Sequence, residues 1–476
     1  MVTECNPRSF EFHALFGRDV VARFDGGRVS SDGGGILIRE VNERFGFVER
    51  FATCFTDHRD PEAIEHPLLD LLKQRIFGLC LGYEDLIDHD TLRHDALLAV
   101  LVGKADPEGL GREHPRDRGK ALAGKSTLNR LELTPVGADA DSRYKKITAN
   151  LHAIQDCFVE AFLAQHPTPP QRIVLDFDAT DDPVHGHQLG RFFHGYYDAY
   201  CFLPLYCFCG DHPLLALLRP ADIDEAAGTT KQLARMVARI RQAWPEVRIV
   251  VRADSGFCRE RLLGWCDHNR VDYIIGLAKN ARLLRALGKE LHEAKLEHER
   301  TGQAARVFQD FTYRTQKSWS RERRVIGKAE HLDKGSNPRF VVTSLSAEEC
   351  DARTLYEQEY CARGDMENRI KEQQLGLFAD RTSCQTLRAN QLRLAFSTVA
   401  YMMLRALREF GLKDTPLEAA QADTIRLKLL KIGAVIRISV RKVWIALSEA
   451  YPWQELFARV YDRLTAWRDP PELSPA

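Results

Sequence analysis

The stretch Arg172-Ile-Val-Leu-Asp-Phe-Asp178 decides how this chain folds. It is an apolar run with β-branched and aromatic residues, which predicts a buried strand that ends at its last residue. Alternate side chains of a strand share a face, so Asp176 and Asp178 lie on one face while Leu175 and Phe177 lie on the other. The predicted strand therefore carries two acids on one face and ends on a carboxylate.

Outward from this strand, the order of predicted elements indicates the fold class. Three strands come in succession, and helices then alternate with two further strands. This order is typical of an RNase H-like mixed sheet, because a purely parallel doubly wound sheet alternates strand and helix from its start. We therefore predict a mixed α/β fold with an RNase H-like core. The elements after the first strand are strands at 202–208 and 214–218, a helix at 229–244, a strand at 247–254, a helix at 260–268 and a strand at 273–277.

Two more acids stand in informative positions. The strand-like run Val250-Val-Arg-Ala-Asp254 ends on a carboxylate, and Glu367 shares one helix face with Tyr360 and Arg363. Carboxylate oxygens bind Mg²⁺, and two such ions can clamp the attacking and leaving oxygens of a phosphodiester. Asp is also a common turn former, and Arg363 and Lys371 can pair with Glu367 on a solvated helix face. A purely structural role therefore stays open for each acid.

At these residues the chain resembles the DDE transposases of bacterial insertion sequences, in the branch with a Tyr-x2-Arg-x3-Glu-x6-Lys signature. Tyr360, Arg363 and Glu367 match its spacing, whereas Gln374 replaces the final Lys. The Asp-x-Thr around Asp178 and the segment Ala253-Asp-Ser-Gly256 are also similar to the family. The resemblance covers residues 170 to 410, and the three motifs in order are more specific than any one alone.

The resemblance implies a role for each matching residue. Asp178, Asp254 and Glu367 would be the catalytic acids that hold Mg²⁺, with Mn²⁺ as a substitute. Tyr360 and Arg363 would contact the DNA end, in keeping with the preference of planar Arg for phosphate oxygens. Lys371, one turn before Gln374, would supply the charge that the signature Lys otherwise provides. Asp176 shares the strand face of Asp178 and remains its rival as the first ligand.

The resemblance also implies the reaction and its partners. It implies metal-dependent cleavage at transposon ends, followed by transfer of the strand into target DNA. The partners would be transposon-end DNA with inverted repeats, target DNA and further copies of the chain, in a homodimer or larger synaptic complex. Two alternatives stay open: an RNase H-like structure-specific endonuclease, and a DNA-binding derivative without catalysis.

The spacing of the acids predicts an insertion in the core. The second and third acids are 113 residues apart (367 minus 254), against 76 for the first and second (254 minus 178). Residues 306–345 alternate like strands and carry nine basic against four acidic residues, a local charge of +5 (nine minus four). Aromatic rings interleaved with cations suit distorted DNA ends. The candidate DNA contacts in this insertion are Trp319, Arg321, Arg323 and Arg324.

Five regions follow from this pattern. They are an N-terminal, mainly helical DNA-recognition region (1–150), the first part of the RNase H-like core (165–280), the β-rich insertion (281–348), the second part of the core (349–410) and a C-terminal helical region (411–476). The last region contains an acid-free basic stretch from Thr424 to Val443. This stretch is either a surface that contacts phosphates or a pair of core helices whose basic residues reach water.

Composition limits the remaining possibilities. Lys plus Arg and Asp plus Glu both total 67, so the formal net charge is zero and any DNA contact must come from local basic patches. The 12 cysteines form no dense framework, and the start of the chain lacks a signal-peptide pattern, which favours a reducing cytoplasm, at the bacterial nucleoid. The apolar stretch from Leu394 to Leu404 is too short to cross a bilayer, so no membrane partner is expected.

Overall fold

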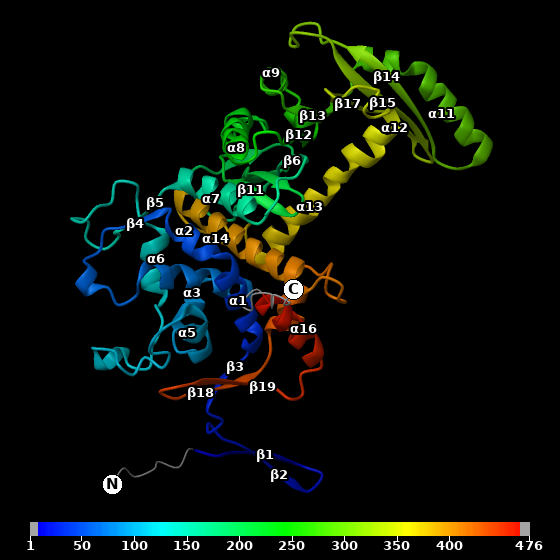
Figure 1. Cartoon of the computed structure of the whole chain (residues 1–476). Helices are drawn as coiled ribbons and strands as arrows, with labels where there is room; N and C mark the ends of the chain where they lie inside the picture. Colours follow the sequence, from blue (N-terminus) through cyan, green and yellow to red (C-terminus); the bar gives the residue numbers. More distant parts are fainter. Residues whose placement is uncertain (1–7, 467–476) are drawn as a thin grey trace, which may run out of the picture. The chain divides into compact units, whose positions relative to one another are not determined.

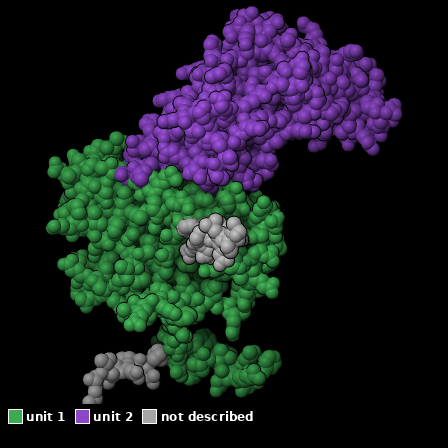
Figure 2. All heavy atoms as spheres, viewed as in Figure 1, with its two compact units in different colours: residues 1–52, 56–148, 399–476 green, residues 53–55, 149–398 purple. Residues whose placement is uncertain are grey.

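The computed structural model describes residues 8–466 (Figure 1). These residues form two units. One unit contains the described parts of residues 1–52, 56–148 and 399–476, and the other contains residues 53–55 and 149–398 (Figure 2). The first is called the terminal unit below and the second the sheet unit.

The sheet unit is built on a mixed nine-stranded sheet with the order β11-β10-β6-β12-β13-β17-β15-β14, in which β16 pairs with β15. The predicted first strand is β6 (Arg172–Ala179), which pairs in parallel with β12 (Arg248–Ala253). Strand β13 (Asp272–Leu277) continues the parallel part, and β10 (Leu205–Cys209) and β11 (His212–Leu217) form its antiparallel edge. The mixed α/β class and the order of these elements are therefore confirmed.

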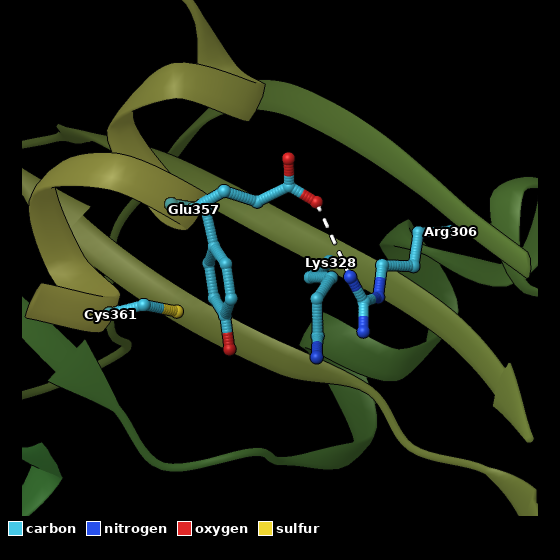
Figure 3. Close-up of a pocket in the computed structure, with 5 residues that line it drawn as sticks. Arg306, Lys328, Glu357 and Cys361 are labelled. Atoms are coloured by element: carbon cyan, nitrogen blue, oxygen red, sulfur yellow. Dashed lines mark ion pairs between the residues drawn. The ribbon is translucent and has the colours of Figure 1, made fainter. Parts of the chain in front are cut away.

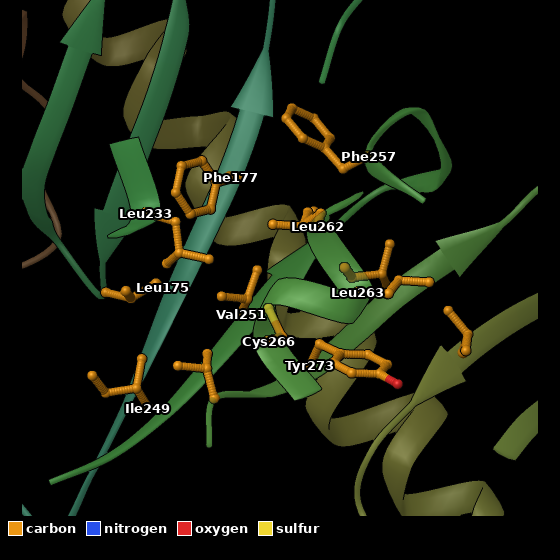
Figure 4. Close-up of a cluster of buried hydrophobic side chains, with 14 of the residues drawn as sticks. Leu175, Phe177, Leu233, Ile249, Val251, Phe257, Leu262, Leu263, Cys266 and Tyr273 are labelled. Carbon is orange, nitrogen blue, oxygen red and sulfur yellow. The ribbon is translucent and has the colours of Figure 1, made fainter. Parts of the chain in front are cut away.

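One face of this sheet carries the main hydrophobic core. Leu175, Phe177, Ile249 and Val251 point into it from β6 and β12 (Figure 4). Helices α7 (Leu151–Ala164), α8 (Thr229–Ala243) and α9 (Glu260–His268) contribute apolar side chains such as Phe162, Leu233 and Leu263 to the same cluster. These strand residues alternate with the acids, so Asp176 and Asp178 face the opposite side of the sheet.

A helical segment packs on that opposite face. It begins with α12 (Ala352–Thr354) and continues through η6 (Leu355–Tyr360), η7 (Cys361–Arg363), α13 (Gly364–Lys371) and η8 (Glu372–Gly376). Leu355 and Tyr356 form a second buried cluster with Val250 and Ile274 of the sheet. The helix that carries the third acid therefore covers the acid-bearing face of β6.

The predicted insertion extends the same sheet. Helices α10 (Ala281–Ala286) and α11 (Gly288–Thr301) precede strands β14 (Ala305–Tyr313), β15 (Arg323–Leu332), β16 (Gly335–Ser336) and β17 (Arg339–Thr343). Strand β17 pairs antiparallel with β13. The region is thus β-rich after two helices, and its strands continue the sheet of the core. A separate three-stranded sheet consists of β7 (Asp182–Pro183), β9 (Ala199–Phe202) and β8 (Phe192–His194).

The terminal unit is mainly helical at its N-terminal side. Its principal helices are α1 (Ile36–Phe45), α2 (Phe47–Ala52), α3 (Leu68–Leu81), α5 (Ala96–Val102) and α6 (Lys125–Glu132). An exposed hairpin of β1 (Phe10–Leu15) and β2 (Arg18–Ala22) precedes them.

The C-terminal region differs from the helical expectation. Besides α15 (Ala422–Ile425), η10 (Arg426–Leu430) and α16 (Gln454–Thr465), it contains the antiparallel strands β18 (Ala434–Ile438) and β19 (Val443–Leu447). Alternating β-branched residues after Gly433 favour a strand over a helix here. Helix α14 (Leu387–Ala406) includes the predicted buried stretch, and Leu394 and Leu404 are each 1% exposed. Within residues 8–466, no helix combines the length and apolarity needed to span a membrane.

Candidate active site

The strand register places two of the three acids at one edge of the sheet. Asp176 lies opposite Arg252 and Phe177 opposite Ala253 in the parallel pair β6 and β12. Asp178 and Asp254 therefore follow at the carboxyl ends of neighbouring parallel strands, where catalytic residues of open α/β sheets commonly lie. Asp254 also caps the short helix η5 (Ser255–Phe257) by accepting a 2.9 Å hydrogen bond from the Gly256 N–H.

Arg363 joins the third acid to the first. Its Nη1 lies 3.4 Å from Asp178 Oδ2, and its Nη2 donates a 2.6 Å hydrogen bond to Glu367 Oε1. Arg363 and Glu367 are one turn apart across η7 and α13, so both side chains project from the same helix face. The structure thus brings together residues that the sequence separates by 189 positions (367 minus 178).

Tyr360 belongs to the same group. A Cβ at Gly276 would lie 2.7 Å from the Tyr360 hydroxyl oxygen and 3.1 Å from the Asp254 carbonyl carbon. Only a residue without a side chain leaves room for this approach of the ring to β13 and Asp254. Burial raises the pKa of Tyr360, and the negative charge of Asp254 raises it further. The phenol therefore stays protonated and able to donate a hydrogen bond beside the acids.

The acids repel one another electrostatically. Burial raises the pKa of Asp178 to about 7, and the charges of Asp254 and Glu367 add to the shift while Arg363 opposes it. A fourth carboxyl group, Glu225, contacts Gly256, and its pKa is raised by burial and by Asp254. This concentration of negative charge at one sheet edge would favour the binding of a cation.

The donor set suits a hard divalent cation in its chemistry. Carboxylate oxygens are preferred ligands of Mg²⁺ and Mn²⁺, and bound positive charge would relieve the repulsion that adds to the effect of burial on the pKa of Asp178. Among residues 8–466, however, no three Asp, Glu, His or Cys side chains stand close enough together to hold a metal ion. The Arg363 guanidinium lies between Asp178 and Glu367 and forms ion pairs with both.

Asp176, the rival for the first position, is engaged elsewhere. Both of its oxygens accept hydrogen bonds from Arg252, at 2.5 Å from Nε and 2.8 Å from Nη2. Arg252 also donates to the Glu359 carbonyl oxygen, and both side chains of the pair are buried. This bidentate pair ties β6 to β12 and to the helical segment above them. Asp176 is therefore paired within the core, whereas Asp178 faces Arg363 and the other acids.

The candidate contacts in the insertion participate in the fold. Trp319 is 4% exposed and packs edge-on against Tyr313, and Arg323 forms buried ion pairs with Glu260 and Asp267. Arg321 pairs with Asp267 as well. Arg324 pairs with Asp310 and donates to three backbone carbonyl groups. The structure thus uses these side chains to hold the insertion together, and it does not bring them to the three acids.

A hollow of about 280 Å³ lies on the other side of η6 (Figure 3). Arg306, Lys328, Tyr356, Glu357 and Cys361 line it. The Arg306 guanidinium lies 3.6 Å from the Glu357 carboxylate across the hollow, and Lys328 Nζ lies 2.8 Å from Glu330. Its cations are therefore balanced by acids, and it carries no surplus charge for a phosphate.

The end of the signature has its own structural explanation. Gln374 donates a 2.8 Å hydrogen bond to Asp182 Oδ1 and another of 3.1 Å to the Asp181 carbonyl oxygen. The side chain at position 374 is thus used to hold the segment after the first acid. Lys371 is exposed one turn earlier.

Two residues near the acids were not anticipated. They are Glu225, in a loop after β11, and Tyr197. Burial raises the pKa of Tyr197, and the negative charges of Asp181, Glu225 and Asp178 raise it further. Neither residue belongs to a periodic segment or a recognisable motif. Only the folded chain shows that they approach the acids.

A comparison with protein families now identifies the chain. The family described as "Transposase DDE domain group 1" matches residues 12–469. The chain belongs to this transposase family. The resemblance seen in the sequence is confirmed to that level, and the family supports an enzyme that cleaves DNA and transfers strands.

Other comparisons add little. No curated protein sequence matches the chain. A solved structure, the cryo-EM structure of the piggyBac transposase synaptic complex with hairpin DNA, is similar with a TM-score of 0.40 and 9% identity. The similarity covers 92% of this chain and 83% of that one.

Proposed function

We propose that this transposase cleaves DNA at transposon ends and joins the freed 3′-hydroxyl to target DNA, with Asp178, Asp254 and Glu367 as its metal-binding catalytic acids. The observation that carries the proposal is the contact of Arg363 with both Asp178 and Glu367. This contact lies at the carboxyl end of β6, next to the end of β12 that Asp254 follows. Mg²⁺ is the proposed ion and Mn²⁺ its substitute, because the donors are all carboxylates.

The residues around the acids suggest how DNA is held. Asp178, Asp254 and Glu367 would hold divalent cations, which would supply charge stabilisation for the phosphodiester oxygens and for the attacking water. The planar guanidinium of Arg363 matches phosphate as well as carboxylate, so it can exchange Asp178 and Glu367 for a DNA phosphate. The Tyr360 hydroxyl, kept protonated beside Asp254, is placed to donate to the same strand. Exposed Lys371 on α13 extends the row of donors.

The same proposal assigns roles to the regions of the chain. An RNase H-like core over 165–280 and 349–410 would hold the acids, with 281–348 as an insertion that widens its sheet. Residues 1–150 would recognise DNA. Transposon ends come in pairs, so the enzyme would act as a homodimer or larger synaptic complex on end DNA with inverted repeats, at the nucleoid in the bacterial cytoplasm.

A gel assay with labelled end DNA and Mg²⁺ tests the proposal. Cleavage together with strand transfer supports the transposase. Cleavage alone supports a structure-specific endonuclease, and binding alone supports a DNA-binding derivative. The decisive variants are Asp254→Asn and Glu367→Gln, with Asp333→Asn as a matched control because Asp333 is 95% exposed. Full cleavage by either of the first two variants would contradict the assignment.

A further inference from the structure

The hairpin of β18 and β19 is only partly covered by the rest of the terminal unit. Strand β3 (Arg28–Ser30) pairs with Ala434, Val435 and Ile436 and goes no further along β18. Beyond that point the hairpin is a two-stranded ribbon, from the pair Arg437 and Trp444 to the turn that joins the strands. Among the described residues, no further strand pairs with this part of the hairpin.

The two faces of the hairpin differ. Ala434 and Ile436 are buried on the inner face, where Gly33 lies so close that a Cβ there would sit 2.9 Å from the Ala434 Cβ. On the outer face Trp444 is 60% exposed, and Val440 at the turn is fully exposed. Val29, Arg437 and Ala446 lie on the same outer face and are exposed as well. The outer face therefore covers no core.

Charge on this hairpin has one sign. From Thr424 to Ser448 the chain has six basic residues and no acid. Arg426 and Lys431 are used within the fold, because they pair with Asp423 and Asp32. Among the described residues, Arg437, Arg441 and Lys442 form no ion pair, and all three are exposed. Lys442 lies 5.2 Å from the centre of the Trp444 ring.

We propose that the ribbon Arg437–Trp444 enters a groove of duplex DNA. The major groove of B-DNA admits a two-stranded ribbon as well as a helix. Arg441 and Lys442 at the turn would neutralise phosphates, and Trp444 on the outer face would pack against sugar or bases. The proposal rests on the transposase function and names a part of the chain that holds its DNA. The region expected to be helical at the C-terminus thereby becomes a DNA-binding element.

A binding experiment with full-length protein tests this role. The probe is a fluorescein-labelled duplex of 30 base pairs with mixed sequence, titrated by anisotropy at several salt concentrations between 50 and 200 mM. Each lost phosphate contact reduces the slope of log K against log salt by about 0.9, so Arg441→Ala with Lys442→Ala should reduce it by about 1.8. Affinity at 150 mM salt should fall by roughly tenfold. Trp444→Ala should weaken binding with an unchanged slope.

The control is a matched double variant, Arg285→Ala with Lys289→Ala, which removes one exposed Arg and one exposed Lys from the sheet unit. It should bind like the wild type. Circular dichroism melting checks that the ribbon variants fold. The proposal would be overturned if the ribbon variant kept the salt slope and the DNA affinity of the wild type. It would also be overturned if light scattering showed that a loss of DNA binding came only from altered self-association of the variant.

The assay separates this inference from the proposed function. Asp254→Asn protein should bind the duplex like the wild type while it fails to cleave end DNA. A wild-type protein that binds through the ribbon but never cleaves would refute the catalytic proposal and leave the ribbon intact. If the wild type cleaves end DNA and the ribbon variant binds the duplex like the wild type, the ribbon proposal is refuted and the catalytic proposal stands.

Discussion

At the scale of single residues, two aspartates on one strand face have opposite environments. Asp176 shares a buried bidentate ion pair with Arg252, whereas Asp178 faces two other acids and one shared arginine. The sequence predicted that both acids share a face, because strand geometry requires it. It could not distinguish them, because Arg252 reaches Asp176 through the pairing of strands that lie 76 residues apart (252 minus 176).

We expect Asp178→Asn to abolish cleavage while the protein stays folded. Metal-assisted charge stabilisation contributes several kcal/mol to the transition state, which corresponds to roughly 10³-fold in rate. The measurement is single-turnover cleavage of end DNA, together with Mn²⁺ binding by calorimetry. Asp178→Asn should lose both, and its melting temperature should not fall below that of the wild type.

Asp176→Asn should have a different effect. Removal of its charge leaves Arg252 buried without its partner, at a cost of about 3 to 5 kcal/mol in the free energy of unfolding. Urea unfolding measures this loss, and metal affinity at low temperature should remain close to that of the wild type. If Asp176→Asn keeps the free energy of unfolding of the wild type and loses metal binding, then Asp176 and not Asp178 is the metal ligand.

Asp182 predicts a pH dependence of stability. Burial raises its pKa from an ordinary 3.8 to about 8, and Oδ2 finds no hydrogen-bond partner among the described residues. The folded state holds a proton that the unfolded state releases between these values. The stabilisation is complete below pH 3.8 and is lost as the pH rises through 8, at up to about 1.4 kcal/mol per pH unit.

Urea unfolding from pH 5 to pH 9 checks this prediction. Asp182→Asn should remove the part of the dependence that comes from Asp182, so the variant is closest to the wild type at pH 5 and more stable than the wild type at pH 9. Asp333→Asn is the control, because Asp333 is 95% exposed. Parallel curves for the wild type and Asp182→Asn would show that Asp182 does not titrate in this range.

At the scale of elements, periodicity was a good guide where strands lie in the core. The apolar runs around β6, β12 and β13 are nearly continuous, as expected for parallel strands buried on both faces. The hairpin of β18 and β19 was missed although nine of the ten residues in its strands are apolar, because several of them are exposed and basic residues surround them. The basic residues of the insertion show a further limit of the sequence, because charge in a sequence does not indicate whether an acid elsewhere will pair with it.

Arg323 provides a test at this scale. Its side chain is 1% exposed and joins β15 to two acids of α9, so Arg323→Ala should lower the free energy of unfolding by about 3 to 5 kcal/mol. Arg321→Ala is the matched control: its side chain is 57% exposed, and such a pair contributes about 1 kcal/mol at most. Denaturant unfolding distinguishes the two. An Arg323→Ala protein of normal stability and weakened DNA binding would return this arginine to the DNA interface.

At the scale of the whole molecule, the sequence predicted five regions, and the structure shows two units. The terminal unit joins the described ends of the chain, a long-range arrangement that no local pattern indicates. The insertion was predicted from the separation of the acids, and its strands proved to extend the core sheet. A net charge of zero also hid the basic ribbon, because the positive charge is local.

A mixing experiment tests whether copies of the chain act together on paired ends. Wild-type protein is combined with Asp254→Asn protein at a constant total concentration, and joined product is measured. If two copies must each supply intact acids, the yield falls with the square of the wild-type fraction. Heat-inactivated protein is the control for dilution. A linear decline would indicate that single copies complete the reaction.

The pair of Asp176 and Arg252 has a consequence for how such chains diverge. Either residue alone would be a charge stranded in the interior, so a lineage that loses one should lose the other within a short interval. Descendants would keep both or replace both with apolar residues of similar volume, while Asp178 and Asp254 stay fixed. Correlated substitution at positions 176 and 252 in related sequences would thus indicate that the two strands are neighbours.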